Sequence, residues 1–402
     1  MAILLTEYRG RKGENDMKIK INSHATTVKP SIIREMKVLA DSYKNVIDFT
    51  LGEPHISHHT YETIHEGLHQ RIMRSPIGYS HQYGVLELRE AIAEYCQTHY
   101  NQDYDPKSEI VVTTGVSEPI SAVLKTILEE GDEVIIFSPS FTLYNSNVKM
   151  YGGKVVLYDM IANEMKVKSD VLSELITPKT KAILVNSPCN PTGKVFSKED
   201  NEAIYECIKD HPIFVISDEI YREIVFDGVE CPSLSDYQEL RDRMFILNGV
   251  SKSFAMTGWR IGYVLGPKEY IQIVAVVHQN FVASASTISQ YATLEALKHP
   301  ELTKNICSLY ERNRNYVYEQ LKPYFKQVVL PEGAFYLYLD ASNYGLSSYE
   351  FAIELLKEQR VALVPSVAFE AQDSGYVRLS YCCDFEVLKE GIARIQNFRK
   401  SL

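Results

Sequence analysis

Short, unbroken runs of Val, Ile and other apolar residues recur through the middle of the chain, with segments of helical character between them. The runs span residues 110–112, 134–137, 182–185, 213–216 and 245–247. A strand with one face in water alternates apolar and polar residues, so unalternated runs indicate strands covered on both faces. Helices between such strands act as right-handed crossovers that place the strands in one sheet. The pattern predicts an α/β domain whose mainly parallel sheet is sandwiched by helices.

The length of 402 residues exceeds what one compact core usually holds, and the texture changes near residue 295. Beyond that point come longer polar helices and a few strands, at residues 334–339 and 377–380. We expect residues 46–290 to form the large domain, and residues 17–45 with 291–402 to form a smaller α+β domain. Residues 1–16 are polar for the most part and are expected to be a disordered extension.

Charge and cysteine content exclude several classes of function. Lys and Arg number 42 against 52 Asp and Glu, a net charge of −10, which argues against a nucleic-acid footprint. No window approaches 18 consecutive apolar residues, so no membrane span is expected. The seven cysteines form no CxxC pair and are odd in number, so the sequence encodes neither a disulfide framework nor a cysteine zinc site. A reducing cytoplasm fits this usage.

Polar residues follow the strand runs where ligands of such sheets bind. They include Thr114-Gly115, the stretch from Asn186 to Gly193, Ser217-Asp218, and the stretch from Asn248 to Lys252. Ligands of open parallel sheets sit beyond the carboxyl ends of the strands. The need for turns between secondary-structure elements explains Gly and Pro at these points, but not the recurring Asn, Asp and Lys.

Lys252 carries the sharpest chemical hypothesis that residue types alone allow. It follows a buried strand among small and apolar neighbours, with Arg260 eight residues further on. Burial and a nearby cation both favour the neutral amine, which is the form that attacks a carbonyl carbon. Because a lone lysine is more often a surface charge, both interpretations stay open at this point.

One metal motif competes with this hypothesis. His65-Glu66-Gly67-Leu68-His69 matches the zinc-protease pattern HEXXH, and His55, His58 and His59 lie just upstream. The alternative is a solvated helix that buries Ile64, Leu68 and Ile72 and carries its histidines to one side. Gly67 within a helix costs about 1 kcal/mol relative to Ala, which weakens the frame of a metal site. We favour the helix without a metal.

The segment from Gly249 to Gly262 resembles the lysine signature of the fold type I, pyridoxal-phosphate-dependent aminotransferases of class I/II. Other landmarks of that family occur in the same order over most of residues 28–400. They are Leu51-Gly52-Glu53-Pro54, Tyr79, Gly84, Leu88-Arg89, Thr114 to Ser117, Pro139-Ser140-Phe141, Asn186 to Gly193, Ser217 to Tyr221, and Tyr376 to Ser380. So many motifs in series make the resemblance specific.

The resemblance implies a role for each residue around pyridoxal 5'-phosphate. Lys252 would hold the cofactor covalently and move the substrate proton, and Asp218 would face the ring nitrogen. Tyr221 and Asn190 would bind the phenolic oxygen, and Phe141 would stack on the ring. The phosphate would be held by Gly115, Val116, Ser117, Ser251, Arg260 and, from the other subunit of a homodimer, Tyr79. Arg378 would bind the substrate α-carboxylate, assisted by Asn190 and Gly52.

The implied function is ping-pong transfer of an amino group from an L-amino acid to a 2-oxo acid such as 2-oxoglutarate. Aspartate-type relatives can carry a lysine where this chain has Ser117, so we expect aromatic or broad specificity, with Tyr83 as a possible pocket residue. A pyridoxal-phosphate-dependent carbon–sulfur lyase is the alternative, and a zinc hydrolase using the HEGLH segment is a distant one. No metal, nucleic-acid partner or membrane partner is expected.

Overall fold

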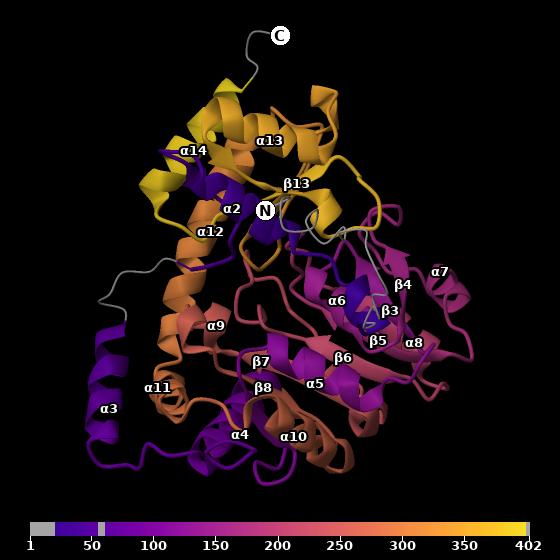
Figure 1. Ribbon diagram of the computed structural model, residues 1–402, viewed down its shortest axis with the longest axis vertical. Coiled ribbons are helices and arrows are strands. Elements are labelled where there is room, and N and C mark those ends of the chain that lie inside the picture. The colour runs from indigo at the N-terminus through magenta and orange to yellow at the C-terminus, as the bar shows by residue number, and fades with distance from the viewer. Residues whose placement is uncertain (1–20, 55–60, 399–402) are drawn as a thin grey trace, which may run out of the picture.

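The computed structural model describes residues 21–54 and 61–398, and its main feature is a long twisted sheet (Figure 1). In spatial order the strands are β2 (Ile110–Thr113), β8 (Gly262–Leu265), β7 (Met244–Gly249), β6 (Phe214–Asp218), β5 (Thr180–Asn186), β3 (Glu133–Ser138) and β4 (Lys154–Asp159). The pairs from β7 through β4 are parallel, whereas β8 runs antiparallel to both of its neighbours. The expected mainly parallel sheet is confirmed.

Helices cover both faces of this sheet. Because side chains alternate across a strand, Ile135 packs with one helical layer while Val134 and Ile136 pack with the other. The first layer holds α3 (Glu62–Ile72), α4 (Leu86–Tyr100), α7 (Ser169–Glu174), α8 (Lys198–Ile208) and α11 (Thr287–Leu297). The second holds α5 (Ser117–Ile127), α6 (Thr142–Met150) and α10 (Lys268–Val282). Strands buried on both faces explain the unalternated apolar runs.

A smaller antiparallel sheet lies in the upper part of Figure 1, where the chain turns yellow. Its spatial order is β12 (Val364–Pro365), β13 (Tyr376–Ser380), β10 (Tyr336–Asp340) and β9 (Gln327–Val329). The helices α12 (Glu301–Leu321), α13 (Ser348–Gln359) and α14 (Phe385–Asn397) pack around it. One continuous core joins this sheet to the second helical layer of the long sheet.

The amino-terminal segment packs against the carboxyl-terminal part of the chain. Strand β1 (Ile47–Asp48) pairs in parallel with β11 (Val361–Ala362), and α2 (Ile32–Asp41) lies against β11 and β12. The remaining short elements are α1 (Ser23–Thr27), α9 (Val250–Ser253), η3 (Leu234–Asp236), η4 (Gln238–Arg243), η5 (Thr257–Trp259), η6 (Ser342–Tyr344) and η7 (Ser366–Ala368). In the described part of the chain, no helix has the length and apolarity needed to cross a bilayer. Residues 1–16 lie outside the described residues.

Candidate active site

Lys252 lies in α9, which begins directly after β7. Its Nζ donates a hydrogen bond of 2.7 Å to the backbone carbonyl of Gly52. The pKa of Lys252 is lowered from 10.5 to about 8, mainly by burial and also by the positive charges of Arg260 and Arg378. Cys382 and Glu53 oppose this effect. At pH 7 the amine is therefore neutral in about a tenth of the molecules, far more than for a lysine with an ordinary pKa, which makes it a competent nucleophile and base.

Asp218 ends β6, the strand next to β7, and its side chain is 2% exposed. Burial raises the pKa of its carboxyl from 3.8 to about 6. The Tyr144 hydroxyl donates to Oδ2 at 2.7 Å and the Ile220 amide donates to Oδ1 at 3.2 Å, and both bonds favour the carboxylate. Lys252 acts electrostatically on Asp218 as well. The two groups thus share one buried site.

Tyr221 and Asn190 lie at the same end of the sheet as Asp218. The Tyr221 hydroxyl is buried and 2.8 Å from the Tyr336 hydroxyl. The backbone amide of Asn190 donates to Asn186 Oδ1 at 2.9 Å, which ties the loop after β5 to the strand itself. Phe141 is half-buried at the start of α6, with its ring edge-on to Tyr144 at 5.7 Å. Asp218, Tyr221, Asn190 and Phe141 are therefore each positioned by the end of a strand or by the loop that follows one.

Four predicted phosphate ligands meet where β2 turns into α5. Gly115 has a φ of +68°, and a Cβ there would lie 2.4 Å from Nη2 of Arg260, so the guanidinium packs directly on this glycine. Val116 and Ser117 follow and open α5, with Val116 buried and Ser117 exposed. Backbone N–H groups at a helix start and an arginine beside them form an anion-binding arrangement.

Ser251 lies in α9, directly after β7, and is the fifth predicted phosphate ligand of this chain. Its residue is 5% exposed, and its hydroxyl has no hydrogen-bond partner among the described residues. A buried hydroxyl without a partner is costly, so it marks a place where a ligand can accept or donate a bond. The hydrogen-bond donors around Gly115 and Ser251 therefore suit a phosphate group.

Arg378 comes from β13 of the smaller sheet and is 2% exposed. Its Nη1 donates to Asn190 Oδ1 at 2.8 Å, and its Nη2 donates to the carbonyl of Thr50. Its Nε is buried without a partner in the described part of the chain. The guanidinium thus joins the smaller sheet to the loop after β5, with donor capacity to spare.

Tyr336, at the start of β10, is a site residue that the sequence analysis missed. Its ring stacks 4.5 Å from the Arg378 guanidinium, and its hydroxyl meets that of Tyr221. A Cβ at Gly52 would lie 1.9 Å from the Tyr336 hydroxyl, so only glycine fits there. Burial raises the pKa of Tyr336 to about 12, which keeps it a neutral donor. No local pattern could identify it, since its partners are distant in sequence.

Two predicted residues stand apart from this cluster within the chain. The side chain of Tyr79 is 94% exposed. Tyr83 packs beside Arg89, whose guanidinium lies 5.8 Å from the ring centroid.

The HEGLH segment forms part of α3, and both the metal and the non-metal interpretation placed it on a helix. Ile64 and Leu68 are buried, Ile72 is half-buried, and His65 and His69 are exposed. Across residues 21–54 and 61–398, no cluster of three His, Cys, Asp or Glu side chains could hold a metal ion. His55, His58 and His59 lie outside the described residues.

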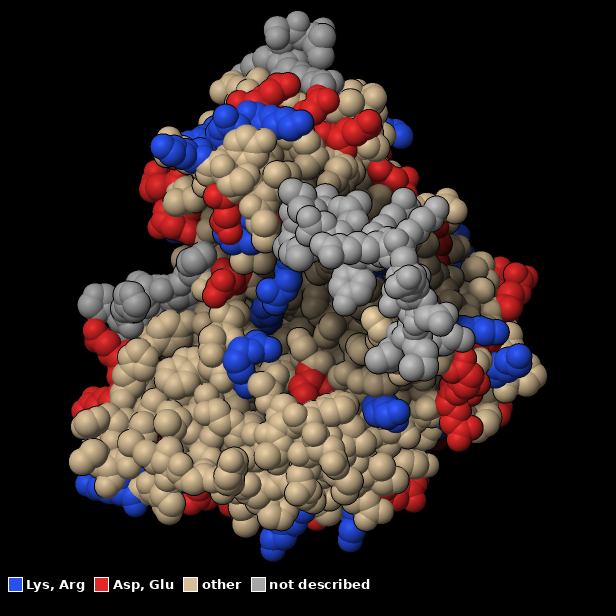
Figure 2. All heavy atoms as spheres, in the orientation of Figure 1, with Lys and Arg blue, Asp and Glu red and all other residues tan. Residues whose placement is uncertain are grey.

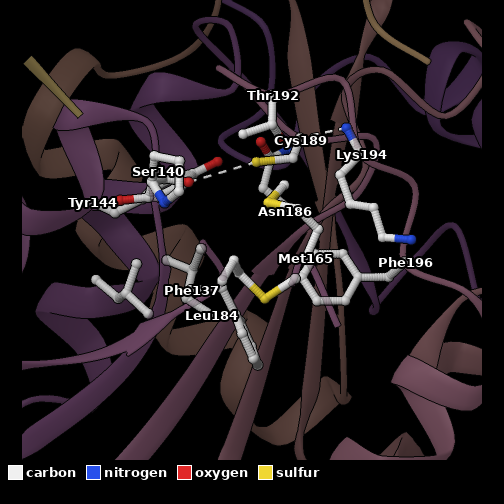
Figure 3. Close-up of a pocket in the computed structure, with 13 residues that line it drawn as sticks. Phe137, Ser140, Tyr144, Met165, Leu184, Asn186, Cys189, Thr192, Lys194 and Phe196 are labelled. Atoms are coloured by element: carbon white, nitrogen blue, oxygen red, sulfur yellow. Dashed lines mark hydrogen bonds between the residues drawn. The ribbon is translucent and has the colours of Figure 1, made fainter. Parts of the chain in front are cut away.

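A small cavity lies beside the ends of β3 and β5 and the loops that follow them (Figure 3). Tyr144, which binds Asp218, lines it together with Ser140, Asn186 and Cys189. Its volume is about 10 Å³, close to the space of one water molecule and far too small for a cofactor. The cavity is therefore not a cofactor site.

Comparisons with known proteins agree with this geometry. The profile of aminotransferase class I and II matches residues 44–395. A probable N-acetyl-LL-diaminopimelate aminotransferase of Bacillus subtilis is 36% identical over 94% of this chain and 95% of its own. Aromatic-amino-acid aminotransferase 2 of Thermococcus litoralis is 36% identical over 93% and 96%.

Among solved structures, the aspartate aminotransferase of Thermus thermophilus with maleate superposes with a TM-score of 0.87 at 34% identity, over 94% of this chain and 99% of its own. The aromatic aminotransferase of Pyrococcus horikoshii OT3 gives a TM-score of 0.82 at 35% identity, over 92% and 99%. The matches span nearly the whole chain and include the strands and loops that carry Lys252, Asp218 and Arg378. The chain belongs to the class I and II aminotransferase family and is a pyridoxal-phosphate-dependent transaminase.

Proposed function

We propose that this transaminase moves an amino group from an L-amino acid to a 2-oxo acid such as 2-oxoglutarate in a ping-pong cycle. The observation that carries the proposal is the pairing of Lys252 and Asp218 in one buried site, each with a pKa moved toward neutrality. An amine that is partly neutral and a buried carboxyl are the two groups that this chemistry requires.

Pyridoxal phosphate, when bound, supplies an electron-withdrawing ring that stabilises negative charge on the substrate's α-carbon. Asp218 keeps a proton on the ring nitrogen, with Tyr144 and the Ile220 amide holding the carboxylate in place. Lys252 removes the proton from the α-carbon and later delivers it, since its amine is neutral enough to act as a base. Tyr221 and Asn190 would bind the phenolic oxygen of the cofactor, and Phe141 would stack on the cofactor ring.

The phosphate is held by Gly115, Val116, Ser117, Ser251 and Arg260. The unpartnered Ser251 hydroxyl and the guanidinium against Gly115 support this assignment. Arg378 binds the α-carboxylate of the substrate, with Asn190 and Gly52 beside it. The spare Nε donor and the orientation by Asn190 suit a planar, bidentate partner.

The active form is a homodimer in which Tyr79 reaches the phosphate of the other subunit. Support comes from an unusually apolar surface: Ile273, Val276 and Phe281 of α10 are 45–50% exposed. Tyr79 lies beside the start of α11, the helix that follows α10, since the neighbouring carbonyl of Gly78 accepts a bond from Thr287. The lower face in Figure 2 has few charged side chains over α4, α5 and α10. Large apolar patches mark protein interfaces.

Three further parts of the proposal concern substrate, domains and location. Aromatic or broad donor specificity is preferred because Ser117 offers no cation for a side-chain carboxylate, although relatives are named for both aromatic amino acids and aspartate. The large domain is proposed as residues 46–290 and the small one as residues 17–45 with 291–402; this boundary falls within α11, most of which packs on the long sheet. The protein acts in the cytoplasm, which accords with its seven free cysteines.

A visible spectrum of the purified holoenzyme, with each amino acid added in turn, tests the function. A donor should bleach the band of bound pyridoxal phosphate, and 2-oxoglutarate should restore it with release of no ammonia. Ammonia released without an acceptor would instead identify the carbon–sulfur lyase. Lys252→Ala should fold and lose all turnover, and normal activity in this variant would exclude the scheme.

A further inference from the structure

A buried histidine on α10 contacts Glu118, in the helix turn next to the proposed phosphate site. His278 is fully buried, and its Nδ1 lies 2.6 Å from Glu118 Oε1. Glu118 stands in the first turn of α5, and its other oxygen, Oε2, accepts the backbone N–H of Thr114 at 2.6 Å. Thr114 immediately precedes Gly115. His278, Glu118 and the turn therefore form one continuous chain of hydrogen bonds.

The position of His278 is hard to explain by packing alone. Its neighbours one turn away on the buried face of α10 are Val274 and Ala275. Its Nε2 has no hydrogen-bond partner among the residues that the structure describes. A buried polar atom without a partner is a cost that an apolar residue at this position would avoid. Sites that break a local rule in this way are often functional.

Glu118 needs a partner for an electrostatic reason. Its carboxylate is 10% exposed and belongs to the helix start where the phosphate is proposed to bind. A carboxylate free to turn toward that anion would repel it, and the Thr114 amide would lose its acceptor. The bond from His278 holds the carboxylate between α5 and α10 with its second oxygen on Thr114.

We propose that His278 is a positioning residue for the phosphate turn, acting through Glu118 on the Thr114–Val116 backbone. It does not contact the phosphate itself. The inference rests on the proposed phosphate site, and it predicts that His278 affects the binding of a phosphorylated cofactor more than that of its dephosphorylated counterpart.

The test compares the dissociation constants of pyridoxal 5'-phosphate and pyridoxal for full-length, cofactor-free protein. His278→Leu removes the donor at similar volume and should weaken pyridoxal phosphate binding about tenfold, with pyridoxal changed less than twofold. His278→Asn keeps a donor near the Nδ1 position and should stay within threefold of wild type. His299→Leu is the control for the same substitution away from the site, because it breaks a surface histidine–glutamate pair with Glu301 (3.1 Å).

Two results would overturn the inference: unchanged pyridoxal phosphate affinity in His278→Leu, or equal weakening of both ligands. If His278→Leu does not fold, Glu118→Ala provides the same comparison, since it removes the acceptor of the Thr114 amide. Failure of the proposed phosphate site looks different: the wild-type protein would then bind pyridoxal and pyridoxal phosphate equally well.

Discussion

Replacing Asp218 by Asn should stabilise the cofactor-free protein while it destroys the enzyme. The buried carboxyl has a pKa of about 6, against 3.8 in its ordinary environment. Between these values the folded protein binds a proton that the unfolded chain releases, so stability falls as the pH rises through this window. Above pH 6 the full cost of burying the charge is present.

The size of this cost follows from the shift. About two pKa units correspond to about 3 kcal/mol at pH 7 and above, and about half of that remains at pH 5. Asparagine has a similar shape and no charge, and it can still bond Tyr144 and the Ile220 amide. The free energy of unfolding of Asp218→Asn should therefore exceed that of wild type by about 3 kcal/mol at pH 8 and by about half as much at pH 5.

Denaturant titrations of both cofactor-free proteins at matched concentration measure this difference. The sign and the pH dependence of the difference in unfolding free energy test the reasoning, because the contributions of the other carboxylates are the same in the two proteins and cancel. A difference that stays constant from pH 5 to pH 8, or a less stable variant, would refute the reasoning. The same variant, reconstituted with cofactor, should lose on the order of 100-fold or more in turnover, since the ring nitrogen loses its charged partner.

Four further predictions follow from the site and the surface. The cofactor-free protein should react with pyridoxal, trapped by borohydride, at a rate that rises as pH rises through about 8, and a midpoint near 10.5 would show that Lys252 is not perturbed. Arg378→Lys should raise the KM of the donor amino acid about 10- to 100-fold and change the affinity for cofactor little, because lysine cannot donate two parallel hydrogen bonds to a carboxylate. His69→Ala should keep turnover within twofold of wild type, and metal chelators should not inhibit the enzyme. Inhibition by a chelator would support the metal-site hypothesis. Val276→Glu should shift the protein from dimer to monomer in sedimentation, and an unchanged mass would place the dimer contact elsewhere.

The sheet and much of the site could be predicted because their signals are local. Strands buried on both faces need continuous apolar runs, and residues 182–185 and 245–247 lie within β5 and β7 as expected. The predicted polar residues follow strands whose carboxyl ends share one edge, so Asp218 and Lys252 meet once the strand order is known. The HEGLH motif shows the opposite case. Its spacing is right for zinc, yet α3 turns His65 and His69 to solvent.

Gly67 shows how packing corrects a local expectation. A glycine within a helix weakens it, but here a Cβ would lie 2.6 Å from Oε2 of Glu295 on α11, so a larger residue at this position would force the Glu295 carboxylate to move. Tyr336 and His278 illustrate the same limit. Each lies in an ordinary strand or helix pattern, and each acquires its partners only when distant segments pack together.

The order of apolar runs and polar strand ends, read along the chain, was sufficient to predict the α/β class, and the series of motifs that resembles the class I/II aminotransferases implied the cofactor and the roles of Lys252 and Asp218. Tertiary structure alone decided how acidic or basic those groups are, which hydroxyls lack partners, and which side chains support the site from behind. The reason is physical: periodicity depends on neighbours a few residues away, whereas burial and electrostatics depend on segments that only folding brings together.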